Sequence, residues 1–160
     1  DIKESDIYLA PQNYRDLFSS ILHIFRNSVD HGIEPRDERV NKNKNEEATL
    51  KISFSKDEDN LLNIEIRDDG KGIDPKKIRS VASKKKELDH IDLRNMQDED
   101  IISLIFEPGI SSREETSMIS GRGVGMDAVR DEVRKLGGSI SVTSKIDEGT
   151  AFVIKIPLFN

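Results

Sequence analysis

Hydrophobic residues recur every three or four positions in several segments of the chain, a spacing that predicts amphipathic helices. The longest of these helices is expected to begin after Asn13, a good N-cap residue, and to run to about His31, before Gly32. Shorter helices are expected over residues 75–85 and 98–106, and from the glycine-rich stretch near residue 121 to about Leu136.

Apolar and polar residues alternate in other segments, which predicts half-buried strands. Residues 50–54 and 62–66 alternate on either side of an acidic turn, and they predict a hairpin. Residues 140–142 and 152–158 predict two further strands, with Asp147-Glu148-Gly149-Thr150 in the turn between them. A short edge strand is expected at residues 6–10, before Pro11. The mixture of elements indicates an α/β domain.

Two segments lack a clear period. Residues 34–47 are charged and predict an exposed loop with a helical turn after Pro35. Residues 111–120 are polar, and a loop of this length inside a compact domain is unusual unless it moves or binds something. The basic run Lys84-Lys85-Lys86 fits a solvated helix end, where lysine complements the helix dipole, better than a phosphate contact.

Composition narrows the class of protein. The 160 residues suffice for one domain with a core, and the net charge of −6 argues against a nucleic-acid partner. The chain has no cysteine, which excludes disulfides and thiolate metal sites and fits a cytoplasmic location. No apolar run is long enough to span a bilayer, and we expect no membrane contact from this segment. Because the sequence starts at Asp1, we expect a longer parent protein. The sequence leaves open whether that parent has a membrane anchor.

The longest predicted helix gathers polar side chains on one face. At about 100° per residue, His23, Asn27, Asp30 and His31 fall within roughly 100° of one another. The Asn27 oxygen suits a hard cation such as Mg²⁺, and Asp30 and the two imidazoles can hydrogen-bond a phosphate, its waters or each other. An ordinary surface helix also has a polar face, so this helix alone does not distinguish a ligand site from a solvent-exposed surface. The opposite face is expected to be covered by Leu17, Phe18, Ile21, Leu22, Ile24, Phe25 and Val29.

Two glycine-rich stretches are candidate ligand loops. Asp68-Asp69-Gly70-Lys71-Gly72 follows a predicted strand, where a carboxylate can accept a hydrogen bond from an exocyclic amine; an acidic turn is the alternative. Gly121-Arg122-Gly123-Val124-Gly125 opens a helix, where unpaired N–H groups and the helix dipole attract phosphate. Its context fits neither a Rossmann nor a P-loop motif, and a flexible linker is the alternative.

The order of these motifs is more specific than any one of them. It resembles the ATP-binding domain of bacterial histidine kinases, in the superfamily shared with gyrase-type ATPases, heat-shock chaperones and mismatch-repair ATPases. The resemblance covers residues 17–158. His-x-x-Arg-Asn-x-x-Asp-His-Gly-Ile-Glu, from His23 to Glu34, and Gly-Arg-Gly-Val-Gly-Met-Asp, from Gly121 to Asp127, are similar to the boxes of chemotaxis-type kinases.

The resemblance implies a fold and a function. The fold is a two-layer α/β sandwich of Bergerat type, with a mixed, mostly antiparallel sheet and helices on one face. Residues 1–160 form a single catalytic domain, and residues 74–120 contain an ATP lid with Phe106 and Gly109 at its base. The domain binds Mg-ATP and transfers the γ-phosphoryl group to a histidine elsewhere. The alternatives are an ATPase or serine kinase of the same superfamily, or a non-catalytic module that retains the fold.

The resemblance also assigns roles to single residues. Asn27 would bind the Mg²⁺, and His23, Asn27 and His31 would be the catalytic residues, with His23 near the γ-phosphate. Asp30 matches a nucleotide-binding position, whereas Arg26 lies off this face and suits a structural role. Asp68 would accept the adenine amino hydrogen, Gly70 and Gly72 would let the base approach, and Thr150 would support it. The remaining nucleotide-binding positions are Ile73, Gly121, Arg122, Gly123, Val124, Gly125 and Met126.

The nucleophile of such kinases is a histidine on another domain. His23, His31 and His90 are the only histidines of this sequence, and none has the context of an acceptor. We therefore expect a histidine-containing phosphoacceptor domain, a dimerisation domain and a downstream response regulator as partners. The isolated domain is expected to bind ATP and to hydrolyse it slowly.

Overall fold

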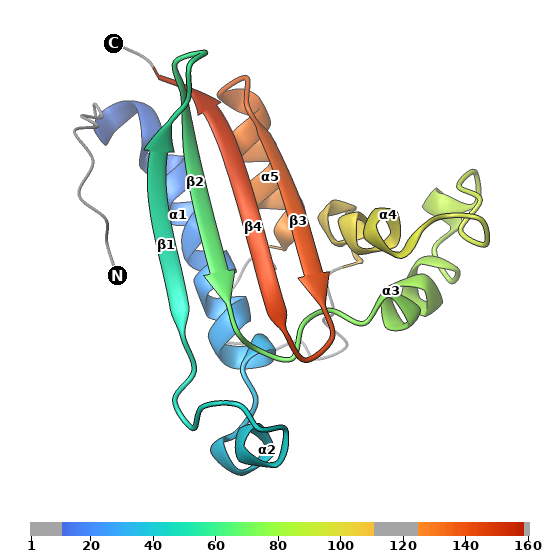
Figure 1. Ribbon diagram of the computed structural model, residues 1–160. Coiled ribbons are helices and arrows are strands. Elements are labelled where there is room, and N and C mark those ends of the chain that lie inside the picture. The colour runs from blue at the N-terminus through green and yellow to red at the C-terminus, as the bar shows by residue number, and fades with distance from the viewer. Residues whose placement is uncertain (1–10, 111–124, 159–160) are drawn as a thin grey trace, which may run out of the picture.

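The computed structural model describes residues 11–110 and 125–158. Its sheet contains β1 (Leu50–Lys56), β2 (Leu61–Asp68), β3 (Ser139–Lys145) and β4 (Gly149–Pro157) in the order β1-β2-β4-β3 (Figure 1). The described strands all pair antiparallel, so the parallel component expected of the sheet is not found among them. The strand expected at residues 6–10 and the loop expected at 111–120 lie outside the described residues.

Strand alternation places one face of the sheet in the core. Ile64 lies between Phe54 of β1 and Ile154 of β4, and Ile154 pairs in turn with Ile140 of β3. Because side chains alternate along a strand, the neighbouring residue Glu65 points to the other face, where it pairs with Ser53. The two-layer α/β class predicted from the sequence is therefore confirmed, with one apolar and one mainly polar sheet face.

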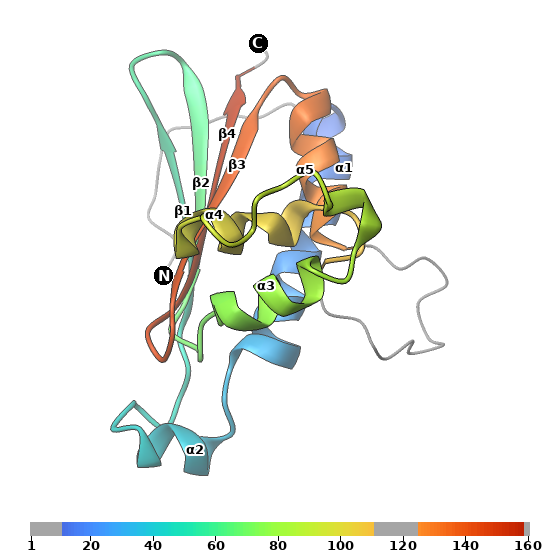
Figure 2. The same ribbon diagram turned by 90° about the vertical axis from the view of Figure 1, so that its right-hand side faces the viewer.

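Two helices cover the apolar face of the sheet. They are α1 (Pro11–Asn27) and α5 (Met126–Lys135), which pack side by side (Figure 2). Helix α1 is described from Pro11 onward and already includes Asn13, which was expected to cap it. Leu22 and Val29 are 64% and 58% exposed, so the prediction that both face the core was wrong. The other residues expected on that face are buried or packed against the core.

A π-helical turn, Ser28–Gly32, follows α1, where the sequence predicted a continuous α-helix. The Ile33 amide donates to the Ser28 carbonyl, five residues earlier, at 2.8 Å. This wider turn changes the direction in which Asp30 and His31 project, because the helical-face argument assumed 100° per residue throughout. Single π turns inside helices are frequent at functional sites.

The charged segment after the π turn is not simply an exposed loop. It contains the short helix α2 (Arg36–Asn41), which was expected only as a turn after Pro35. Glu34 and Arg39 are 3% and 1% exposed, so the prediction of exposure fails at both. Burying two charged side chains would be costly if they did not pair with each other and with further polar groups, as described below.

A second, smaller hydrophobic cluster lies beside the main core. It is built from α3 (Pro75–Ala82), the 3₁₀ turns Lys86–Leu88 and Leu104–Phe106, and α4 (Asp98–Ser103). Helix α3 is three residues shorter than expected, and Asp74 caps it by accepting from the Lys76 amide at 2.9 Å. Phe106 packs edge-on against Phe152 of β4, with ring centroids 6.3 Å apart.

No helix within residues 11–110 and 125–158 is long and apolar enough to cross a membrane.

Candidate functional site

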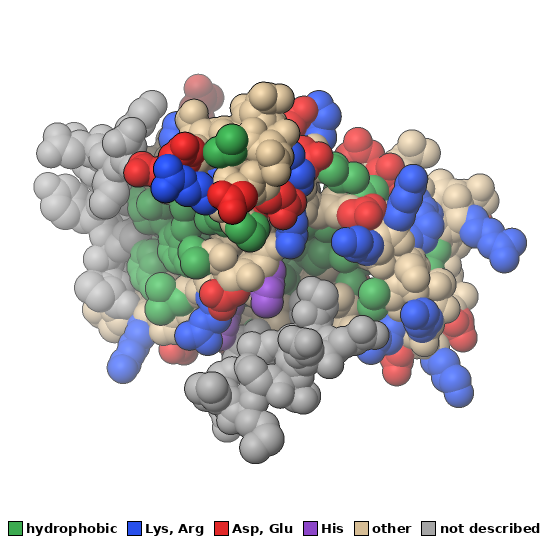
Figure 3. All heavy atoms as spheres, turned by 90° about the horizontal axis from the view of Figure 1, so that it is seen from below, with side chains coloured by type: hydrophobic (Ala, Val, Ile, Leu, Met, Phe, Trp, Pro, Cys, Tyr) green, Lys and Arg blue, Asp and Glu red, His purple; other side chains and the backbone are tan. Residues whose placement is uncertain are grey.

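Three segments far apart in the sequence meet at one end of the sheet. They are the end of α1 with its π turn, the end of β2, and the start of β4 (Figure 1). Seen from that end, histidine side chains reach the surface beside hydrophobic ones (Figure 3). A hollow of about 210 Å³ opens at the ends of β2, β3 and β4, and Asp68, Ser144 and Thr150 are among its lining residues.

Asp68 joins these three segments. Its side chain lies at the last position of β2 and the residue is 4% exposed. One oxygen, Oδ1, accepts from the amides of Gly70 at 3.0 Å and Thr150 at 3.1 Å, and the other accepts from the Ser28 hydroxyl at 2.8 Å. A carboxylate has about four acceptor sites. These neutral donors occupy three of them, which leaves acceptor capacity beside Ser28.

Thr150 and Ser144 connect the glycine loop to the other hairpin. Their hydroxyl oxygens lie 3.0 Å apart on paired residues of β3 and β4. The Ser144 oxygen also accepts from the Ile73 amide at 2.8 Å. Sequence reasoning missed both Ser28 and Ser144, since a lone serine in a helix or strand has no local signal that reveals a contact 40 or 71 residues away.

The glycines of this site make room for the protein's own backbone. A Cβ on Gly70 would lie 2.3 Å from the Gly32 carbonyl oxygen, and a Cβ on Gly72 would lie 2.2 Å from that of Lys145. The amide of Lys71 donates to the same Gly32 oxygen at 2.8 Å. These two glycines, expected to let a ligand approach, therefore first allow three chain segments to meet.

Gly149, at the start of β4, has a positive φ of 106°, and a Cβ added to it would lie 2.0 Å from the Asp68 carbonyl oxygen. We expect Gly149→Ala to lower the free energy of unfolding by about 3 kcal/mol or more, since backbone strain of about 1–3 kcal/mol adds to a clash. Urea unfolding measures the change.

Gly137→Ala is the matched control, because Gly137 also has a positive φ, 71°, but its nearest neighbour would be a Pro157 carbon at 4.0 Å. Equal losses for the two variants would show that the contact with Asp68 adds nothing.

The residues predicted on the α1 face divide into two groups. His23 and Asn27 are half-buried and lie one helical turn apart, so they neighbour each other on one face. Asp30 and His31 lie on the π turn and are exposed. Among the described residues, the Asn27 side chain has no hydrogen-bond partner, and its amide oxygen is available to a ligand.

The second glycine box is described only in part. Gly121, Arg122, Gly123 and Val124 lie outside the described residues. Gly125 occupies the N-cap position of α5 and supplies no side-chain cap, whereas Met126 is 3% exposed and packs into the core. The first turn of α5 therefore has amides that an anion can bind, whereas the Met126 side chain serves packing.

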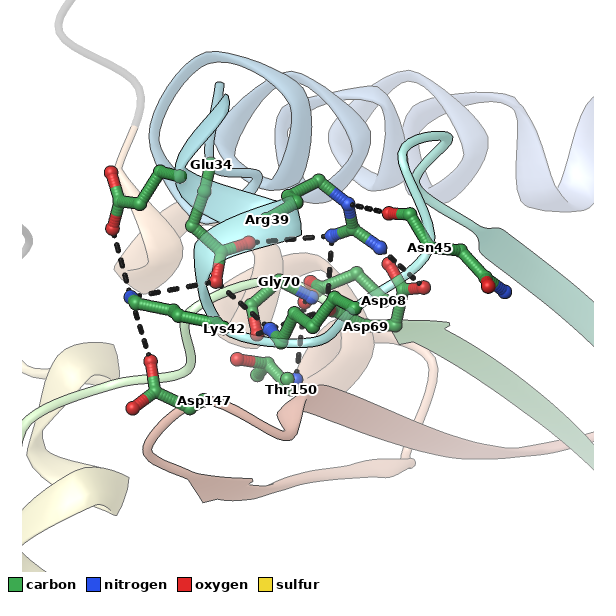
Figure 4. A network of polar contacts seen from close by, with 12 residues as sticks. Glu34, Arg39, Lys42, Asn45, Asp68, Asp69, Gly70, Asp147 and Thr150 are labelled. Atoms are coloured by element: carbon green, nitrogen blue, oxygen red, sulfur yellow. Dashed lines mark hydrogen bonds and ion pairs between the residues drawn. The ribbon is translucent and has the colours of Figure 1, made fainter. Parts of the chain in front are cut away.

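A buried polar network supports the loop that follows Asp68 (Figure 4). The Arg39 and Glu34 side chains, 1% and 0% exposed, form an ion pair at 3.3 Å, and Arg39 also binds the Asp69 carboxylate at 2.9 Å. Burial opposes ionisation of Glu34, but the hydrogen bond from Lys44 and the charges of Lys44 and Lys42 outweigh it and lower the pKa of Glu34. Nothing in the sequence beyond the charges themselves indicates this network.

Comparisons with known proteins identify similar sequences. The family model described as "Histidine kinase-, DNA gyrase B-, and HSP90-like ATPase" matches residues 13–160. The chain is 40% identical over 157 residues to the chemotaxis protein CheA of Halobacterium salinarum, covering 98% of this chain and 23% of that protein. It is 38% identical over 156 residues to the gliding motility regulatory protein of Myxococcus xanthus, covering 98% and 20%. The chain thus spans about a fifth of these relatives.

A solved structure shows the same fold. The blue-light activated histidine kinase of Erythrobacter litoralis superposes with a TM-score of 0.56 and 16% identity, over 99% of this chain and 34% of that one. At this identity the likeness concerns the fold alone, an open antiparallel sheet with helices on one face.

Proposed function

The chain belongs to the histidine kinase-, DNA gyrase B- and HSP90-like ATPase family and is an ATP-binding domain of the chemotaxis-kinase type; we propose that it binds Mg-ATP and transfers the γ-phosphoryl group to a histidine on another domain. One observation carries the proposal. The buried Asp68 carboxylate is held by neutral donors from three segments and keeps acceptor capacity. An adenine amino group can donate to such an acceptor, whereas the guanine oxygen at the same position cannot.

Asn27 would contribute to the magnesium site. Mg²⁺ prefers oxygen ligands and is usually bound by one or two protein groups together with substrate phosphates and water. The described residues contain no cluster of three or more histidines or carboxylates suited to a metal, so a single amide oxygen beside the phosphates fits this mode. The ion would neutralise charge on the phosphates when bound.

The rest of the chemistry is positioning and electrostatic stabilisation. The amides of the first turn of α5 would bind a phosphate group of the nucleotide, because a helix N-terminus favours anions. Four further candidate nucleotide-binding residues precede this turn in the chain: Gly121, Arg122, Gly123 and Val124. His23 is the candidate for hydrogen bonding near the γ-phosphate, with the exposed His31 and Asp30 at the rim. Residues 74–120 are the candidate ATP lid, and their described part has its own hydrophobic cluster.

The acceptor would lie on another part of a longer kinase. We propose a histidine-containing phosphoacceptor domain and a dimerisation domain in the parent protein, with a response regulator downstream. The rival functions are an ATPase or serine kinase of the same superfamily and a non-catalytic module. The paired histidines of the first box and the Met126-Asp127 ending of the second favour the histidine kinase.

Calorimetric titration of ATP and GTP into the domain, with and without Mg²⁺, tests the proposed function. We expect Mg²⁺-dependent binding that prefers ATP. Folded protein that binds neither nucleotide would support the non-catalytic module. Phosphate transfer from the bound nucleotide to an added histidine-phosphotransfer domain would then separate the histidine kinase from the ATPase or serine kinase.

A further inference from the structure

We propose that Arg39 and Lys44 are positioning residues that set the preference of this site for adenine, an inference that rests on the proposed function. Both belong to the charged segment between the π turn and β1. Figure 4 shows Arg39 of this segment beside Asp69 and Gly70. Neither Arg39 nor Lys44 is expected to touch the nucleotide. Each fixes the backbone that presents Asp68 to it.

Arg39 ties its own segment to the loop at Asp69. Its guanidinium donates to the Asp69 carboxylate at 2.9 Å and to the Asp69 carbonyl at 3.3 Å. The same group donates to the carbonyls of Asn45 at 2.7 Å and Glu47 at 3.4 Å. The other Asp69 oxygen accepts from the Thr49 amide at 2.9 Å. Asp69 is thereby held from two sides.

Lys44 fixes the next residue. Its ammonium donates to the carbonyls of Asp69 at 2.8 Å and Gly70 at 2.6 Å and to Glu34 Oε1 at 2.9 Å. The amide of Gly70 is itself a donor to Asp68 Oδ1. The Asp69 carbonyl and the Gly70 N–H belong to one planar peptide unit, so a change that releases the Asp69 carbonyl from Lys44 acts on a hydrogen bond that orients the Asp68 carboxylate.

The charges of the network favour the same role. Its cations pair with the neighbouring carboxylates: Arg39 and Lys44 with Glu34, Arg39 with Asp69, and Lys42 with Asp147. Asp68, by contrast, accepts hydrogen bonds from a hydroxyl and two amides, which are neutral donors. A cation placed on Asp68 would compete with the amino group of a bound adenine. Glu34 and Asp69 thus hold both cations where they support the loop without occupying Asp68.

The test compares ATP with inosine triphosphate, which carries a carbonyl oxygen where adenine has its amino group. We expect Lys44→Met to lower the ratio of ATP affinity to inosine triphosphate affinity by about 10-fold, the scale of one charge-assisted hydrogen bond. Lys44→Arg is expected to restore most of the ratio. Calorimetry measures the two affinities of each variant at a temperature at which it is folded. The unfolding temperature of each variant is recorded separately.

Lys42→Met is the matched control, because Lys42 lies two residues away and its ion pairs within the described chain are with Glu34, Glu38 and Asp147 rather than with residues 68–70. Its ratio is expected to match that of the unaltered chain. A reduced ratio in Lys44→Met alone supports the positioning role. An unchanged ratio with only a lower unfolding temperature overturns it and leaves a structural role.

If Lys44→Met does not fold, Asp69→Asn replaces it. The Asp69 side chain is 39% exposed and its amide can still accept from Thr49, but the ion pair with Arg39 is lost. An unchanged nucleotide ratio in folded Asp69→Asn would overturn the proposal. Failure of the unaltered chain to prefer ATP over inosine triphosphate would instead contradict the adenine site itself, and the proposed function with it.

Discussion

Replacing Asp68 by Asn is expected to weaken ATP binding by about 100-fold while the domain remains folded. The amide keeps one oxygen to accept from Gly70 and Thr150, and its NH₂ group can donate to the Ser28 hydroxyl, which can act as acceptor. The same NH₂ group faces the adenine amino group. In the variant a donor therefore opposes a donor, whereas in the unaltered chain the Asp68 carboxylate accepts from the adenine amino group. Loss of a charge-assisted bond and a new unfavourable contact together account for a change of this size.

Titration with inosine triphosphate distinguishes this effect from general damage. Its carbonyl oxygen can accept from the new amide, so the Asn variant is expected to reverse the nucleotide preference. Asp147→Asn is the control, because Asp147 lies at the same end of the sheet and is exposed. Unchanged ATP affinity in Asp68→Asn would remove this carboxylate from the adenine site.

The parts of the fold that the sequence predicts are those fixed by local period. The alternation of Leu62, Ile64 and Ile66 requires one buried sheet face wherever the strand lies, and the structure has it. The amphipathic pattern of α1 likewise places Leu17 and Ile24 in the core. The prediction that Leu22 and Val29 face the core is wrong, because a helical pattern shows which residues share a face but not how wide the covered face is.

The support of the candidate site could not be predicted in this way. In the sequence, Glu34 and Arg39 look like surface residues, because charged side chains are almost never fully buried unless they are paired. The pairing is not visible there, since the Asp69 partner of Arg39 lies 30 residues beyond it. Ser28 is a similar case, since its hydroxyl matters only through Asp68, 40 residues later. Such contacts arise from the tertiary fold, which brings the segment after α1 to the end of β2 and which no single segment encodes.

The glycines show a related limit. Their spacing after β2 indicates that something approaches the backbone closely, and this is correct. The sequence does not say what approaches, and the structure places the carbonyls of Gly32 and Lys145 there. A glycine box can therefore mark the assembly of a site as much as the contact with its ligand.

Replacing Asn27 by Ala is expected to remove the Mg²⁺ dependence of ATP binding, so that affinity with Mg²⁺ falls to the value without it. Asn27 ends α1 and has no side-chain partner among the described residues, and alanine is the better helix former, so the fold should be unaffected. The amide oxygen is then the only group lost, and a site that relies on one protein ligand beside the phosphates cannot replace it. Asn13→Ala, the same change at an exposed position of the same helix, is expected to leave binding intact. If Asn27→Ala still binds ATP in a Mg²⁺-dependent manner and transfers phosphate normally, the assignment of this helix face to the metal is wrong.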